Sequence, residues 1–120
     1  MKPLGFPKTR RLLTSDAFKG VFDHVDKKFF TKGFLVLVRK NVNLPPRLGL
    51  VVSKKNVSLS ANRNIVKRAI RESFRINQQL LDGLDIVVLV RKDVSEIDRK
   101  SLWQALNQLW HSVGTARGKF

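Results

Sequence analysis

The stretch that decides the fold spans residues 47–75 and reads RLGLVVSKKNVSLSANRNIVKRAIRESFR. Its first part is mostly apolar and predicts a strand over 47–53. A loop with two lysines follows, and Ser60 favours the start of a helix over about residues 60–80, which Gly83 ends. A strand that leads into a long helix indicates a sheet with helices packed on it.

The predicted helix has two chemically different faces. On a helical wheel, four of its residues lie within about 80° of Val66 and form an apolar arc, namely Ala69, Ile70, Ser73 and Phe74. The opposite arc is basic and polar, with Arg63, Asn64, Lys67, Arg68, Arg71 and Arg75. Like charges four residues apart destabilise an isolated helix, so this repeated pattern favours a phosphate-binding face over an ordinary solvated one.

The sequence before this stretch predicts a short helix and a strand. Thr14 and Ser15 are good N-caps for a helix that ends near Asp23, with Phe18 and Phe22 on one face. Residues 33–39 read as a strand. Because only a short, proline-containing loop separates it from the strand over 47–53, we expect the two strands to be antiparallel neighbours.

The sequence after this stretch predicts one more strand and a last helix. Residues 85–91 read as the strand, and Ser95 or Asp98 caps the helix that follows. The apolar residues of that helix recur at helical spacing and are expected in the core, together with two tryptophans: Leu102, Leu106, Leu109, Val113, Trp103 and Trp110. The expected order is therefore αββαβα, an α+β fold built as a small two-layer α/β sandwich with a mixed sheet.

Length and composition limit the classes of protein to which this chain can belong. Its 120 residues suit one domain, with residues 1–13 extended and residues 114–120 a frayed basic tail. With 24 Lys and Arg against 9 Asp and Glu, the net charge is +15, which indicates a polyanionic partner such as nucleic acid. The absence of Cys excludes disulfides and thiolate metal sites, and no apolar run is long enough to span a membrane. We expect a cytoplasmic protein.

The order of these motifs resembles the family of bacterial ribonuclease P protein subunits. That family has an R-(I/V/L)-G-L-x-V-x-K-K strand followed by an R-N-R-x-K-R-x-x-R-E helix, which residues 47–55 and 63–72 match closely. The resemblance covers roughly residues 6–113 in the right order. One departure stands out, because Ile65 occupies the place of the second arginine of the helix motif.

The resemblance implies both a fold and a function. Members fold as αβββαβα-like variants of one small sandwich with a left-handed βαβ crossover. They bind a large catalytic RNA, and the holoenzyme cuts precursor tRNA to release the mature 5′ end. The RNA carries the chemistry with bound Mg²⁺, so we expect no catalytic residue, metal site or cofactor in the protein, and no need for a protein partner.

By motif match, the resemblance also assigns site residues. Contacts with the catalytic RNA are expected from the loop and the basic arc of the helix, that is from Ser53, Lys54, Lys55, Arg63, Asn64, Lys67, Arg68, Arg71 and Arg75. Phe18 and Phe22 resemble the aromatic pair that lines a cleft for the single-stranded 5′ leader, although core packing is an equal alternative for them.

Three other functions are compatible with parts of the sequence. A stand-alone RNA-binding protein, such as a small ribosomal protein, fits the composition equally well. A DNA-binding regulator would need a recognition helix and a dimer surface, which we do not identify. A self-sufficient protein nuclease would need clustered acids, and the only loose candidates are Asp82, Asp85, Asp93 and Asp98.

Overall fold

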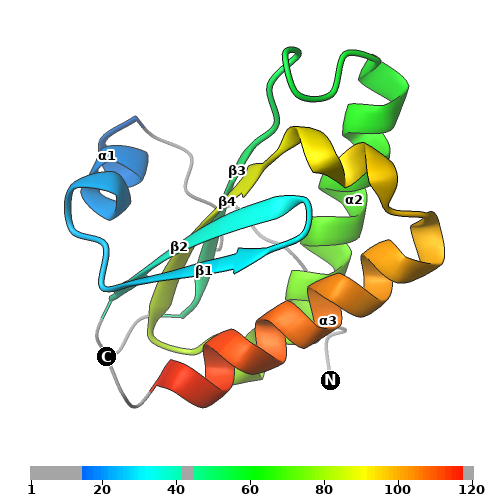
Figure 1. Ribbon diagram of the computed structural model, residues 1–120. Helices are drawn as coiled ribbons and strands as arrows, with labels where there is room; N and C mark the ends of the chain where they lie inside the picture. Colours follow the sequence, from blue (N-terminus) through cyan, green and yellow to red (C-terminus); the bar gives the residue numbers. More distant parts are fainter. Residues whose placement is uncertain (1–14, 42–44, 118–120) are drawn as a thin grey trace.

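A computed structural model describes residues 15–41 and 45–117 (Figure 1). The elements follow in the order α1 (Ser15–Asp23), β1 (Lys27–Thr31), β2 (Phe34–Lys40), β3 (Arg47–Val51), α2 (Ser60–Ile76), the 3-10 helix η2 (Gln78–Leu81), β4 (Leu84–Val90), the 3-10 helix η3 (Lys92–Glu96) and α3 (Arg99–Ala116). The expected extended segment 1–13 lies outside the described residues. None of the helices in the described ranges combines the length and apolar character needed to cross a membrane.

The order αββαβα expected from sequence patterns is wrong by one strand, β1. The observed order, αβββαβα, is the one that the family resemblance implies. Strand β1 reads KKFFT and lies at the edge of the sheet, where it pairs only with β2. An edge strand has one neighbour and needs little apolar sequence, so its pattern is weak. Of its two phenylalanines, Phe29 packs against the core and Phe30 is 69% exposed.

The four strands form one mixed sheet in the order β1-β2-β4-β3. Strand β4 is antiparallel to β2 and parallel to β3, so the two strands expected to be neighbours are separated by β4. The physical reason is that β4 reads LDIVVLV and is almost entirely buried, which suits the centre of a sheet covered on both faces. Strand β3, α2 and β4 form a βαβ unit. The left-handed crossover expected for this unit stays a prediction.

Helices α2 and α3 cover one face of the sheet (Figure 1). Phe34, Val36 and Val88 of the sheet share one buried cluster with Ile70 of α2 and Leu106 of α3. These two layers confirm the expected α/β sandwich. On the opposite face, α1 packs Val21 against Leu37 and Val87 in a second, smaller cluster, and so adds a short third layer.

The last helix begins and packs as expected, with one exception. The Asp98 side chain caps it by accepting a hydrogen bond of 2.7 Å from the backbone N–H of Ser101. The expected apolar face is buried, and Trp110 is fully buried, but Trp103 is 37% exposed and is not a core residue. Helix α3 continues to Ala116, within the segment expected to be a frayed tail. Residues 118–120 lie outside the described ranges.

Helix α2 is shorter than expected and ends at Ile76. The Asn77 side chain donates a 2.7 Å hydrogen bond to the Ser73 carbonyl oxygen, and its backbone N–H points to the carbonyls of Ser73 and Phe74. These bonds satisfy the last carbonyls of the helix, and the chain continues as η2. Gly83, expected to end α2, instead takes a positive φ of 79° between η2 and β4.

Candidate nucleic-acid interface

Helix α2 presents a buried apolar face and a basic one. The buried residues are the apolar arc expected from the wheel: Val66, Ala69, Ile70, Ser73 and Phe74. The hydroxyl of Ser73 accepts a 2.8 Å hydrogen bond from the indole N–H of Trp110, which fixes α2 against α3. We call the other side of α2 the basic face and define it by Arg63, Asn64, Lys67, Arg68, Arg71 and Arg75.

Three cations of the basic face remain available to a partner. Arg68 and Arg71 are exposed and Lys67 is half-buried. Within residues 15–41 and 45–117, no carboxylate forms an ion pair with any of these three side chains. They therefore place positive charge at the surface of the helix, where it is not neutralised inside the described fold.

Arg75 is engaged by its own helix. Its guanidinium donates hydrogen bonds of 2.9 and 3.1 Å to the Glu72 carboxylate, one turn back. These hydrogen bonds lower the pKa of Glu72 and raise the pKa of Arg75. The pair carries no net charge, so Arg75 adds less to the attraction of a polyanion than the sequence alone indicates.

Arg63 has a structural role that sequence reasoning missed. Its Nη1 atom donates hydrogen bonds of 2.9 Å to the backbone carbonyls of both Val57 and Ser58. A guanidinium has five N–H donors, so this atom holds the loop before α2 while the other nitrogens keep donors for a partner. The only sequence signal for this role is the position of Arg63, one turn after an unusually polar loop.

The loop with the two lysines is built by its polar neighbours. The Ser53 hydroxyl accepts a hydrogen bond of 3.2 Å from the backbone N–H of Asn56. The Asn56 side chain donates one of 2.9 Å to the Val90 carbonyl at the end of β4. Lys54 and Lys55 are exposed between these anchors, and the loop leads directly into the N-terminal end of α2 (Figure 1). The loop thus adds two exposed positive charges before the N-terminal end of α2.

Phe18 and Phe22 are not equivalent in the structure. Phe18 is half-buried and packs against the cluster of Val21, Leu37 and Val87, whereas Phe22 is 44% exposed. The structure shows packing for Phe18, and the role of the pair in a cleft for the 5′ leader stays a prediction. Phe18 contributes to packing of α1 on the sheet, and Phe22 offers a ring to solvent.

Beside α1, an apolar row crosses all four strands on the same face of the sheet. Directly paired residues share a face, and the register aligns Phe30 with Leu35, Leu35 with Leu89, and Leu89 with Val51. Leu35, Leu89 and Val51 are half-buried, and all three pack against the α1 cluster. We call these four residues the apolar row. Sequence reasoning did not find it, because it depends on the pairing of strands distant in the chain.

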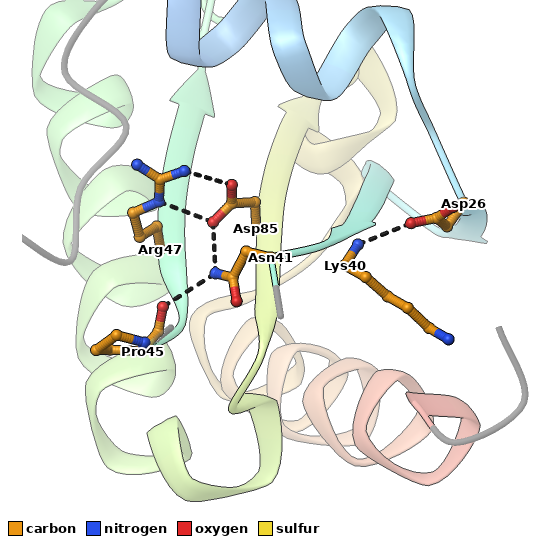
Figure 2. Close-up of polar contacts among 6 residues, drawn as sticks. All are labelled: Asp26, Lys40, Asn41, Pro45, Arg47 and Asp85. Atoms are coloured by element: carbon orange, nitrogen blue, oxygen red, sulfur yellow. Dashed lines mark hydrogen bonds and ion pairs between the residues drawn. The ribbon is translucent and has the colours of Figure 1, made fainter. Parts of the chain in front are cut away.

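The polar end of this sheet face is fixed by a buried carboxylate (Figure 2). Asp85 of β4 is 4% exposed and accepts hydrogen bonds of 2.8 and 2.6 Å from the Arg47 guanidinium of β3. The Asn41 amide donates to Asp85 at 2.8 Å and to the Pro45 carbonyl at 3.0 Å. The hydrogen bonds to Asp85 raise the pKa of Arg47. The charge of Arg47 is thus used inside the protein, where it pairs with the buried Asp85 carboxylate.

At the start of β1, another carboxylate ties the chain to β2 (Figure 2). The Asp26 side chain accepts a 2.7 Å hydrogen bond from the backbone N–H of Lys40. The ammonium group of Lys40 points away from Asp26 in the same view.

The carboxylates considered for a protein nuclease do not converge. Asp85 is paired with Arg47, Asp98 caps α3, and Asp82 ends η2. Among the residues that the structure describes, no group of three or more His, Asp or Glu side chains lies close enough together to hold a metal ion. Asp85 and Asp98 have roles in the fold, as a partner of Arg47 and as a helix cap.

Comparisons with known proteins agree on one family. A model of the ribonuclease P family matches residues 6–114. A ribonuclease P protein component of Pseudomonas putida is 47% identical over 112 residues, 93% of this chain and 84% of the relative. The solved structure of the Staphylococcus aureus RNase P protein aligns with a TM-score of 0.76 at 26% identity, over 84% of this chain and 92% of that one. The Thermotoga maritima RNase P protein gives 0.69 at 36% identity, over 79% and 89%.

Proposed function

Because the chain belongs to the ribonuclease P protein family, we propose that it is the RNA-binding subunit of a ribonucleoprotein that removes the 5′ leader of precursor tRNA. The observation that carries this proposal is the basic face of α2, where Lys67, Arg68 and Arg71 stay unpaired within the described fold. Together with Lys54 and Lys55 they offer five cations to a phosphate backbone.

The basic face is proposed to bind the catalytic RNA. If each of the five cations neutralises one phosphate, the logarithm of affinity falls with the logarithm of salt with a slope of about −4.5. Raising salt from 50 to 200 mM would then weaken binding by about 500-fold. Arg63 and Ser53 act mainly by shaping the loop, and Arg75 contributes less because Glu72 neutralises it.

The α1 side of the sheet is proposed to receive the 5′ leader. Phe22 of α1 presents an exposed ring. The partly exposed apolar row lies on the sheet face that α1 covers, and unstacked bases are proposed to lie on these two surfaces. Stacking on an aromatic ring contributes roughly 1–3 kcal/mol per base and depends little on sequence, which suits an enzyme that accepts many leaders.

In this proposal the chemistry of cleavage resides in the RNA partner, which also holds the Mg²⁺ ions. The protein supplies positive charge and stacking surfaces, in keeping with carboxylates that are engaged in ion pairs and helix caps. The site therefore positions the precursor and the RNA, and no protein partner is required. We further propose that this assembly works in the cytoplasm.

A cleavage assay tests the proposed function. A precursor tRNA is incubated at low Mg²⁺ with the protein alone, with a bacterial ribonuclease P RNA alone, and with both. We expect cleavage at the mature 5′ end only when both are present. If the protein does not stimulate the RNA, the chain is a different kind of RNA-binding protein. If the protein cleaves alone, its carboxylates have a catalytic role that the proposal denies.

A further inference from the structure

A cavity of about 430 Å³ opens where the first turns of α2 and α3 meet η3. Its floor is apolar and well buried, since Val66, Val94 and Leu102 are at most 7% exposed. Ile65 and Ile97 are half-buried and form its walls. A volume of this size falls in the range of small-molecule sites and exceeds that of one nucleobase.

The rim of the cavity is polar and carries no acid. Asn56 and Asn62 contribute amide groups, and Arg99 contributes an exposed guanidinium. The amide nitrogen of Asn56 already donates to Val90, which leaves its oxygen as an acceptor. None of the twelve residues that line the cavity is Asp or Glu, so the rim favours an uncharged or anionic ligand.

A second, smaller hollow adjoins the first through Asn56, which lines both. Arg91 and Lys92 line this hollow together with one acid, Asp93. The surface next to the cavity is therefore net cationic, as a site for a ligand attached to phosphates requires.

Two apolar residues occupy positions where polar residues are usual. Ile65 replaces the second arginine of the family motif, and it lines the cavity. Leu59 takes the N-cap position of α2, where it makes no side-chain cap and is 64% exposed beside the same cavity. An N-cap is normally Ser, Thr, Asp or Asn, so this leucine gives up a helix-stabilising contact. Both residues add apolar surface around the opening of this cavity.

We propose that this cavity takes a single unstacked nucleobase of the RNA partner, an inference that rests on the proposed function. A base has two apolar faces and a polar edge, which match the apolar walls and the amide rim. Its attached phosphates lie toward the cationic surface on the rim and in the adjoining hollow. The site differs from the basic face of α2, because it holds a base by shape while that face holds the phosphate backbone by charge.

The test fills the cavity and compares the result with the same change elsewhere on α2. Ile65→Phe places a larger side chain in the wall, and Ile76→Phe is the control, since Ile76 is 56% exposed at the other end of the helix and does not line the cavity. Affinity for a bacterial ribonuclease P RNA is measured across a salt series. We expect Ile65→Phe to weaken binding about tenfold with an unchanged salt slope, and Ile76→Phe to stay within about twofold of the unchanged chain.

Chemical probing of the RNA gives a readout that a structural defect would not produce. Dimethyl sulfate modifies the Watson–Crick edges of unpaired adenines and cytosines, and a carbodiimide modifies those of uracil and guanine. The unchanged protein and Ile76→Phe should alter the reactivity of one unpaired base that Ile65→Phe leaves as in the free RNA. All other protections should persist in the three complexes. If Ile65→Phe fails to fold, Asn62→Ala removes an exposed rim amide and takes its place.

The outcomes separate this inference from the proposed function. If the unchanged protein does not bind the RNA, the proposed function fails and the cavity has no RNA ligand. If it binds, but Ile65→Phe and Ile76→Phe match it in affinity and in probing, the RNA-binding function stands and the base site is wrong. A change in salt slope with Ile65→Phe would also overturn the inference, because it would show a lost phosphate contact.

Discussion

The two faces of the sheet are covered very differently. On one face, α2 and α3 enclose a buried apolar core in which the Phe74 and Trp110 rings meet edge to face, with centroids 5.7 Å apart. On the other face, the short helix α1 buries only a small cluster, and the apolar row beside it stays partly open. One face of the sheet is thus enclosed by helices, and the other stays partly open where the 5′ leader is proposed to bind. Substitutions on the two faces should therefore affect different measurements.

The largest effect is expected from the core. Trp110→Ala removes a fully buried indole and its hydrogen bond to Ser73. We expect the free energy of unfolding to fall by about 3–5 kcal/mol, measured by urea denaturation. Trp103→Ala is the matched control on the same helix and should change stability by less than about 1 kcal/mol, because its side chain is partly exposed. Equal losses from both variants would contradict the difference in burial.

The next effect tests whether the ion pair on the α1 side of the sheet contributes to the stability of the protein. Asp85→Asn removes the charge that pairs with Arg47 on the α1 side of the sheet. We expect a loss of about 2–3 kcal/mol in urea denaturation, less than for a fully buried pair because the Arg47 side chain is 34% exposed. Glu72→Gln serves as the control, because its carboxylate side chain is 45% exposed whereas that of Asp85 is 6% exposed. If Asp85→Asn leaves the free energy of unfolding unchanged, the contacts of Asn41 and Pro45 are sufficient to stabilise this end of the sheet.

The third effect concerns binding at α1. Phe22→Ala removes an exposed ring, so stability should hardly change while holoenzyme affinity for a precursor with its leader falls about tenfold. Affinity for mature tRNA, which lacks the leader, should stay the same. Phe18→Ala should instead lower stability, since that ring packs against Val21. If both substrates lose affinity equally with Phe22→Ala, the ring does not contact the leader.

The smallest effect is a pH dependence at the start of α3. The hydrogen bond from Ser101 lowers the pKa of Asp98 in the folded protein. The ionised Asp98 side chain therefore contributes its full stabilisation above the ordinary aspartate pKa of about 3.9. This stabilisation is lost as the pH falls through the lowered pKa of the folded protein. Asp98→Asn keeps a capping side chain that does not titrate. The difference in melting temperature between the two proteins should change only below about pH 4, and a difference that varies near neutral pH would contradict this origin.

Sequence patterns predicted the helices better than the sheet, and the reason is the range of the interactions involved. The apolar faces of α2 and α3 follow the helical period, so Val66, Phe74 and Leu106 could be placed inside from local spacing alone. The pairing of β2 with β4 joins residues far apart in the chain, and a short loop misleadingly suggested β3 as the neighbour of β2. The exposure of Trp103 depends on how α3 is rotated against α2.

The site shows the same limit. The residue types of the basic face were readable from the sequence, but the partners of its cations were not. Arg63 bonds to the carbonyls of Val57 and Ser58, and Arg75 bonds to Glu72, which only the folded loop and the side-chain directions reveal. The apolar row and the cavity beside Ile65 also assemble from separate elements. Composition therefore gave the sign of the surface charge and not its distribution.

The central position of β4 has a consequence for how the chain folds during its synthesis. On the ribosome, β1 and β2 emerge before β3 and can form a hairpin, but β3 emerges without the strand that it will pair with. The gap between β2 and β3 is filled only when residues 84–90 leave the exit tunnel. Until then α2 has no completed sheet to pack on. Its basic face and its apolar face are therefore both exposed to solvent during this time. Folding of the whole sheet is thus postponed until β4 has emerged, as its non-local pairing requires.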